Sequence, residues 1–131
     1  MKHYVCRGCG NIVAMVNDTG KRVCCCKENM DELVPDHKKE LEAGHKPYIK
    51  ESGGVVTVTV GNEDKRHPML PEHAVAWVCL VTTEGSHRKI LRPDGTAEAC
   101  FHLSPGEKVI KAFAYCNVHG IWVAEVEHSG A

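Results

Sequence analysis

Cysteine and histidine are the residues whose number and spacing suggest chemistry in this sequence. The chain has 8 Cys and 9 His among 131 residues, and both side chains bind zinc and transition metals. Five of the cysteines lie between residues 6 and 26, whereas Cys79, Cys100 and Cys116 are spread through the rest. This clustering predicts a thiolate-rich metal site near the N-terminus.

The first candidate site begins with the C-x2-C pair Cys6 and Cys9 and continues with three adjacent cysteines, Cys24, Cys25 and Cys26. Four tetrahedral thiolates suit either iron or zinc, and the spacing does not separate the two metals. The three adjacent cysteines offer one sulfur more than four ligands require. A disulfide between neighbouring cysteines would be strained, so metal binding is the better interpretation.

The second candidate site contains Cys116 and His119, which are separated by two residues in a short connection. Each of three other histidines has a proline within two residues of it in the chain: His45, His67 and His73. A proline restrains the backbone and lowers the entropic cost of fixing a ligand. The remaining histidines are expected at the surface, and Cys79 is expected to be a core thiol. The surface group comprises His3, His37, His87, His102 and His128.

The elements that position these residues are expected to be β-strands. Residues 1–35 have few aliphatic side chains and need a metal to fold, and the polar stretch 36–42 forms a boundary with room for one helical turn. Residues 55–60 alternate Val with Thr, as in a half-buried strand, and residues 73–82 read as a central strand. Segments 109–115 and 121–126 flank the Cys116 connection. Short strands with regular turns favour an antiparallel sandwich.

Composition excludes several classes of function. The net charge of -1 and the scarcity of aromatic residues argue against nucleic-acid binding. The longest apolar run, 74–81, is too short to cross a bilayer. A polar segment follows Met1 directly, so we expect a cytoplasmic protein whose thiols are reduced.

Motifs along nearly the whole chain resemble desulfoferrodoxin, the two-iron form of superoxide reductase. Segment 4–13 (YVCRGCGNIV) is similar to the desulforedoxin module, and gapless alignment puts the adjacent ligand pair on Cys25 and Cys26, leaving Cys24 a spectator. The motifs at 67–69 (HPM), 72–73 (EH) and 115–122 (YCNVHGIW) resemble the C-terminal domain of the family.

The resemblance implies an all-β protein with two domains and two iron ions. Residues 1–35 would form a desulforedoxin/rubredoxin-like domain, with an FeCys4 site at Cys6, Cys9, Cys25 and Cys26. Residues 36–131 would form an immunoglobulin-like β-sandwich with an Fe(His)4Cys site. Its implied ligands are His45, His67, His73, His119 and axial Cys116. The implied activity is reduction of superoxide to hydrogen peroxide, with rubredoxin or another electron donor, in a homodimer.

One departure concerns the approach of the substrate. The family commonly has Glu-Lys before the first ligand histidine, and this chain has Ala43-Gly44 there. We hypothesise that Lys46 supplies the positive charge and that Glu42 reaches the metal. Two alternative functions are a rubredoxin-like electron carrier or redox sensor, and a zinc-stabilised binding module.

Overall fold

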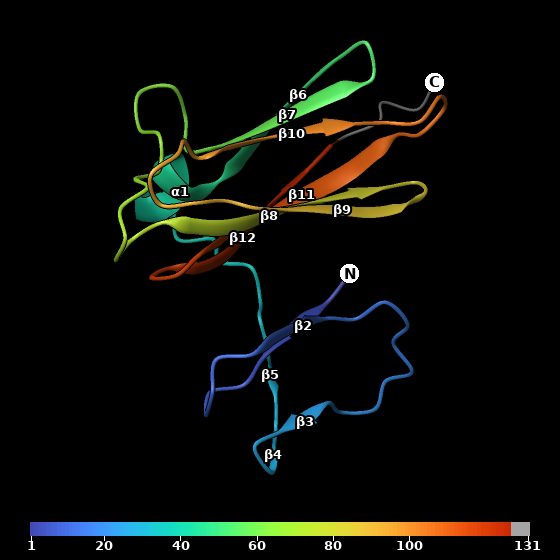
Figure 1. Cartoon of the computed structure of the whole chain (residues 1–131), viewed down its shortest axis with the longest axis vertical. Helices are drawn as coiled ribbons and strands as arrows, with labels where there is room; N and C mark the ends of the chain where they lie inside the picture. The colour runs from blue at the N-terminus through green and yellow to red at the C-terminus, as the bar shows by residue number, and fades with distance from the viewer. Residues whose placement is uncertain (127–131) are drawn as a thin grey trace. The chain divides into compact units, whose positions relative to one another are not determined.

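The chain forms two compact units, Met1–Val34 and Pro35–Ala131, in a computed structural model that describes residues 1–126. This division falls one residue before the boundary predicted from the sequence. Pairings between the named strands of the described residues are antiparallel, and the prediction of an all-β fold is confirmed (Figure 1). Within the described residues, no helix is long and apolar enough to span a membrane.

The first unit consists of short strands joined by turns. It has a three-stranded sheet in the order β2-β1-β5 and a separate two-stranded hairpin, β3-β4. The strands are β1 (His3–Val5), β2 (Ile12–Ala14), β3 (Cys24–Cys25), β4 (Glu28–Asn29) and β5 (Asp31–Glu32). Its buried apolar side chains are few, Val5, Met30 and Leu33 besides Cys6. Such a small core fits the expectation that a metal stabilises this unit.

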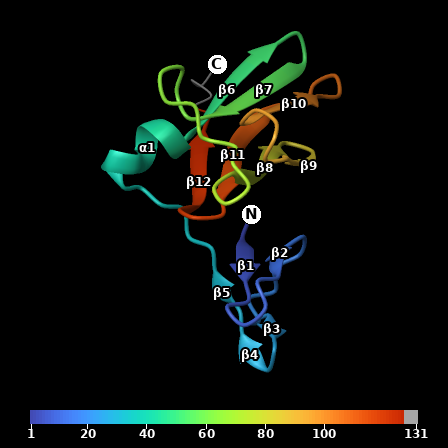
Figure 2. The ribbon, with the colours of Figure 1, turned by 60° about the vertical axis from the view of Figure 1, so that its left-hand side comes forward.

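The second unit is a sandwich of a three-stranded sheet, β10-β7-β6, and a four-stranded sheet, β12-β11-β8-β9. The turn expected around residues 36–42 is a helix, α1 (Lys39–His45), which Figure 2 shows beside the sandwich. The strands are β6 (Pro47–Ser52), β7 (Val55–Val60), β8 (Val75–Thr82), β9 (Gly85–Ile90), β10 (Glu98–His102), β11 (Val109–Cys116) and β12 (Gly120–Glu125).

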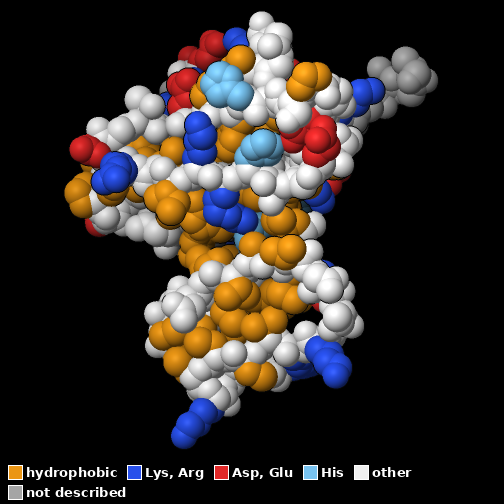
Figure 3. All heavy atoms as spheres, turned by 45° about the vertical axis from the view of Figure 1, so that its right-hand side comes forward, with side chains coloured by type: hydrophobic (Ala, Val, Ile, Leu, Met, Phe, Trp, Pro, Cys, Tyr) orange, Lys and Arg blue, Asp and Glu red, His pale blue; other side chains and the backbone are white. Residues whose placement is uncertain are grey.

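The core of the second unit lies between the two sheets. Val56, Val58 and Val60 alternate inward along β7, as the Val/Thr pattern predicts, and meet Leu80 of β8 and Phe101 of β10. Burial of these side chains holds the sheets together, at roughly 1.5–3 kcal/mol for each large aliphatic or aromatic residue. On the face drawn in Figure 3, acidic and basic side chains of this unit are interspersed.

The surface prediction for the histidines is correct for some residues and wrong for one. His37 and His102 are exposed, but His3 is 2% exposed. His3 lies on β1, the central strand of the first unit's larger sheet, which explains the error. His87 is part-exposed and paired with a buried carboxylate, Glu107. His128 lies outside the described residues. Cys79 is buried, as expected for a core thiol.

Candidate metal centres

The structure brings the sulfur atoms of Cys6, Cys9, Cys25 and Cys26 within 4.8 Å of one another. Cys9 Sγ and Cys25 Sγ are 3.6 Å apart, and Asn11 Nδ2 donates to Cys25 Sγ over 3.8 Å. The turn after Cys6 is closed by the Gly10 amide, which donates to the Cys6 carbonyl over 2.8 Å. These are the four cysteines that the resemblance implies for the first site.

The β3-β4 hairpin explains why Cys24 is outside this cluster. Successive side chains of a strand point to opposite faces, so Cys24 and Cys25 diverge. Cys26 and Lys27 form the two-residue turn, both with positive φ (53° and 64°), as in a type I′ turn. The left-handed turn brings Cys26 back to the side of Cys25, while Cys24 Sγ donates to Asn29 Oδ1 over 3.2 Å.

Hydrogen bonds shift the pKa values of Cys6 and Cys26 in opposite directions. The backbone N–H of Cys9 donates to Cys6 and lowers the pKa of the Cys6 thiol to about 7. Hydrogen bonding with the neighbouring thiols, Cys6 first, raises the pKa of Cys26 to about 12. Four adjacent thiolates repel one another, so full ionisation of the cluster requires a metal ion between them.

In the second unit, His45, His73, Cys116 and His119 have ligand atoms that lie within 4.8 Å of one another. His67 joins them, because its Nε2 is 3.2 Å from Cys116 Sγ. The five residues that the resemblance implies for the second site are therefore neighbours in space. They come from α1, from the loop between β7 and β8, and from the β11-β12 turn.

The four imidazoles form a ring in the order His45, His67, His73, His119. Neighbouring ring centroids in that order are 4.8, 4.8, 5.3 and 4.6 Å apart, whereas His45 and His73, across the ring, are 6.3 Å apart. His45 Nε2 lies 3.0 Å from His119 Nδ1. This arrangement lets four ring nitrogens face one ion.

Backbone carbonyls orient two of these rings. His45 Nδ1 donates to the carbonyl of Leu41, one turn earlier in α1, over 2.8 Å. His67 Nδ1 donates to the carbonyl of Pro68 over 2.7 Å. In both residues Nε2 therefore carries the lone pair and faces the site, as in metal-binding histidines.

Burial favours the neutral form of two of the imidazoles, those of His45 and His67. It lowers the pKa of His45, and it lowers that of His67 to about 4. His73 Nε2 is buried and has no hydrogen-bond partner among residues 1–126. Neutral imidazoles beside a thiol, with one ring nitrogen unsatisfied, fit a transition metal such as iron, whose ligands these side chains are.

The loop between β7 and β8 is built to present His67. The His67 amide donates to the Val60 carbonyl over 3.0 Å, and the Gly61 amide donates to the Lys46 carbonyl over 3.0 Å. Gly61 has φ 83°, and a Cβ there would overlap the Lys65 carbonyl oxygen. Glycine is therefore required for the loop to fold back on itself.

Asn117 connects the segment of His73 to the turn that carries Cys116. Its Oδ1 accepts from the Ala74 amide at 3.0 Å, and its Nδ2 donates to the Glu72 carbonyl at 3.1 Å. A bulge between Tyr115 and Cys116 shifts the β8-β11 register just before the candidate ligand Cys116. Bulges of this kind re-aim side chains beside functional sites.

The Cys116 sulfur receives a hydrogen bond within its own turn. The His119 amide lies 3.5 Å from Cys116 Sγ and donates to it. The Asn117 amide instead donates to the Ala74 carbonyl over 3.2 Å. Of these two backbone amides, the one on His119 is available to adjust the electron density of the thiolate.

The two candidate residues for substrate attraction pair with each other. Lys46 Nζ lies 3.5 Å from Glu42 Oε1, one turn apart at the end of α1. Both side chains are about half exposed and line a cleft beside β12. Lys46 directly follows His45, which brings this charge pair next to the candidate ligand set.

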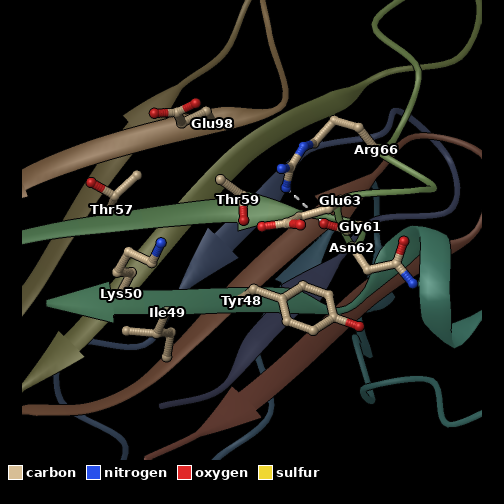
Figure 4. Close-up of a pocket in the computed structure, with 10 residues that line it drawn as sticks. All are labelled: Tyr48, Ile49, Lys50, Thr57, Thr59, Gly61, Asn62, Glu63, Arg66 and Glu98. Atoms are coloured by element: carbon tan, nitrogen blue, oxygen red, sulfur yellow. Dashed lines mark hydrogen bonds between the residues drawn. The ribbon is translucent and has the colours of Figure 1, made fainter.

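A larger hollow, of about 560 Å³, lies over the outer face of β6, β7 and β10 (Figure 4). Its lining mixes Lys50 and Arg66 with Glu63 and Glu98, and Arg66 Nη1 donates to the Gly61 carbonyl over 2.8 Å. None of the nine candidate ligands lines it. It shares with the second site only the loop that carries His67.

Comparison with known proteins now places the chain in a family. The family model described as Desulfoferrodoxin matches residues 36–125. The chain is 36% identical to a desulfoferrodoxin of Nitratidesulfovibrio vulgaris over 122 residues, which cover 93% of this chain and 94% of that protein. The chain belongs to the desulfoferrodoxin family, as its motifs predict.

Solved structures agree with this assignment. The superoxide reductase from Treponema pallidum has a TM-score of 0.80 and 31% identity, covering 95% of this chain and 98% of that one. The superoxide reductase (1Fe-SOR) from Giardia intestinalis has a TM-score of 0.55 and 30% identity, and the match covers 64% of this chain and 97% of the Giardia chain. The first match spans nearly the whole chain.

Proposed function

We propose that this protein is a superoxide reductase whose second unit binds one iron ion through His45, His67, His73, His119 and Cys116. The observation that carries the proposal is the ring of four imidazoles beside one buried thiol. Membership in the desulfoferrodoxin family and the likeness to superoxide reductases support it. Five protein donors would leave a bound iron ion free to take a small anion as a further ligand.

The side chains of this site have distinct roles in the proposed reaction. Imidazole ligands carry no negative charge, so the four histidines would leave the positive charge of a bound ferrous ion largely uncompensated, and the site would attract an anion. Cys116 would hold the metal as a thiolate and donate electron density to it, as a thiolate does in haem proteins, and the hydrogen bond from the His119 amide would moderate that donation. When bound, iron supplies the one-electron couple for the net reaction, in which superoxide, one electron and two protons give hydrogen peroxide.

The four cysteines of the first unit would hold a second iron ion that stores or relays electrons. Four thiolates are also a common zinc set, so the metal has to be identified by analysis. We further propose that a rubredoxin-like carrier supplies the electron, that the chain forms a homodimer, and that Lys46 and Glu42 act in substrate attraction and in reaching the metal.

The competing function is a rubredoxin-like electron carrier or redox sensor without superoxide turnover. The cluster of four thiols favours it, because such a cluster suffices for one-electron exchange. That function gives no role to the ring of histidines, which is why we prefer the reductase.

The deciding experiment combines metal analysis, visible spectra and pulse radiolysis of the purified protein. A superoxide reductase should contain two irons per chain and show a thiolate-to-iron band that ascorbate bleaches. Pulse-generated superoxide should oxidise the reduced protein at near-diffusional rate, about 10⁸–10⁹ M⁻¹s⁻¹. A colourless protein with stoichiometric zinc would rule out the reductase, and iron without a superoxide reaction would leave the carrier.

A further inference from the structure

Trp122 of β12 stacks on a candidate iron ligand. Its ring centroid is 5.1 Å from that of His45, with an interplanar angle of 29°. The ring-to-ring contacts of His67, His73 and His119 are with other imidazoles of the donor set. The ring of four imidazoles therefore has one aromatic neighbour from outside, and it lies against His45.

Trp122 also lines a cleft of about 420 Å³. The residues that line the cleft come from β12, from α1 and from the segment before α1. Figure 2 shows these three parts of the chain on the same side of the second unit. The Asp36 amide donates to the Ile121 carbonyl over 2.9 Å and fastens this segment to β12. The cleft thus leads from the surface to an indole that touches His45.

The lining of the cleft suits a transient protein contact. Exposed Lys39 and Glu125 give its rim both signs of charge, and the pair of Glu42 and Lys46 lies beside them. Charges of both signs orient a partner and favour fast exchange over tight binding. Trp122 is 2% exposed, so a donor has to dock in the cleft to approach it.

The indole also has an unused polar group. Trp122 Nε1–H is buried and has no acceptor among residues 1–126. Buried donors in native proteins usually find a partner.

We propose that this cleft is the docking site of a small one-electron carrier protein and that the electron reaches the iron through Trp122 and His45. The inference rests on the proposed function of the second unit. The step transfers one electron: the carrier is oxidised by one electron and ferric iron becomes ferrous. No covalent bond forms or breaks, and no proton is required. The stacked rings of Trp122 and His45 provide a short path through this part of the fold.

The test compares Trp122→Leu with Trp122→Phe in the full-length iron-loaded protein. Reduced rubredoxin is the probe, and stopped-flow absorbance follows reduction of the second site. We expect Trp122→Leu to slow this reduction about tenfold, equivalent to about 1.4 kcal/mol in the barrier, and Trp122→Phe to restore most of the rate. Trp77→Leu is the matched control, because Trp77 stacks on Tyr115, not on a histidine.

Two further measurements separate electron conduction from a structural role. The iron content and the midpoint potential of the second site should stay at wild-type values in Trp122→Leu. Reversing the rim charges with Lys39→Glu and Glu125→Lys should change the rubredoxin rate and its salt dependence, whereas reduction by ascorbate should be unaffected.

Two results would overturn the inference. An unchanged rubredoxin rate in Trp122→Leu would mean that electrons enter elsewhere, and a lowered iron content or a shifted midpoint potential would make Trp122 merely structural. An absence of any superoxide reaction in the wild-type protein would instead defeat the proposed function, and the rubredoxin comparison would still decide the route of the electron.

Discussion

His67 Nε2 and Cys116 Sγ lie 3.2 Å apart, although 49 residues separate them in the chain. His67 is held by the loop that folds back at Gly61, and Cys116 follows a bulge in β11. The turn at Gly61 and the bulge in β11 are unrelated backbone features, and together they place the His67 nitrogen and the Cys116 sulfur next to each other. Both side chains are buried, so this contact is the part of the site best protected from water.

Replacing Cys116 with serine tests the role of the thiolate. Serine keeps the size of the side chain but removes the soft sulfur ligand. We expect Cys116→Ser to lose the thiolate-to-iron band of the second site and most of its superoxide reactivity. Visible spectroscopy checks the first expectation. Cys100→Ser, at a part-exposed position on β10, is the control and should keep the band; a variant Cys116→Ser with an unaltered spectrum would exclude this cysteine as a ligand.

Asn117 should matter for metal affinity without being a ligand. It fastens the backbone around His73 to the Cys116 turn through Ala74 and Glu72. Loss of such an outer partner typically lowers metal affinity 10–100-fold, so we expect about that effect in Asn117→Ala. Competition with a chelator measures it in the intact protein.

Asn117→Asp is the graded control for that prediction. An aspartate keeps the acceptor for the Ala74 amide but loses the donor to the Glu72 carbonyl, so its affinity should lie between wild type and Asn117→Ala. Equal affinities for all three proteins would mean that the turn holds His73 without this side chain.

Local patterns in the sequence predicted four strands of the second unit and, together with the family motifs, the candidate ligands. The Val/Thr alternation of residues 55–60 predicts the inward face of β7, and prolines mark the three distant histidines. The family motifs then select the candidate ligands from the nine histidines of the chain. Spacing alone could not predict that they would meet, because their contacts depend on how the loop after β7 and the helix α1 fold onto the sheets.

Other features have weaker signals in the sequence. The hydrogen bond from His45 to Leu41 is an i, i-4 contact that becomes visible only once residues 39–45 are known to be helical. The stack of Trp122 on His45 joins positions 77 residues apart and has no local pattern. Cys24 is different, since strand alternation followed by a left-handed turn could have separated it from Cys25 and Cys26.

The hairpin geometry predicts different results for neighbouring cysteines. Cys24 donates to Asn29 on the outer side of β3, so Cys24→Ser should retain the metal and the spectrum of the first site. Cys25→Ser should lose both, and the first unit should unfold because its core is small. Metal stoichiometry and circular dichroism distinguish the two. Metal loss in Cys24→Ser and retention in Cys25→Ser would reverse the assignment.

Glu107 should make the second unit sensitive to acid. Its carboxylate accepts hydrogen bonds from Thr82, from His87 Nε2 at 2.8 Å and from the Ser104 amide at 2.9 Å, with Thr82 the largest influence. These bonds lower its pKa from 4.5 to about 2. A carboxyl group with a lowered folded-state pKa stabilises the fold above its unfolded pKa, and this contribution disappears as the pH falls from 4.5 towards 2.

Glu107→Gln removes that contribution, because an amide does not titrate. The variant should be less stable than wild type at pH 7, and the difference between the two should shrink as the pH falls through this window. Urea unfolding of both proteins at matched metal content measures the difference. Glu84→Gln, at an exposed turn position, should show no such trend. A difference independent of pH would mean that Glu107 acts through packing alone.

The pair of Lys46 and Glu42 gives opposite predictions for the encounter with superoxide. Lys46 Nζ is 3.5 Å from Glu42 Oε1, so the carboxylate cancels much of the positive charge beside His45. Lys46→Ala should lower the second-order rate of the superoxide reaction, whereas Glu42→Gln should raise it by unmasking the lysine. Both effects should diminish with added salt, which screens exposed charges within about 10 Å at 0.1 M ionic strength. Pulse radiolysis at two salt concentrations measures them.

Lys50→Ala, on β6, is the control for the loss of a lysine elsewhere in the second unit. Equal superoxide rates in wild type and Lys46→Ala at low salt would show that Lys46 is a solvated surface residue without a role in steering.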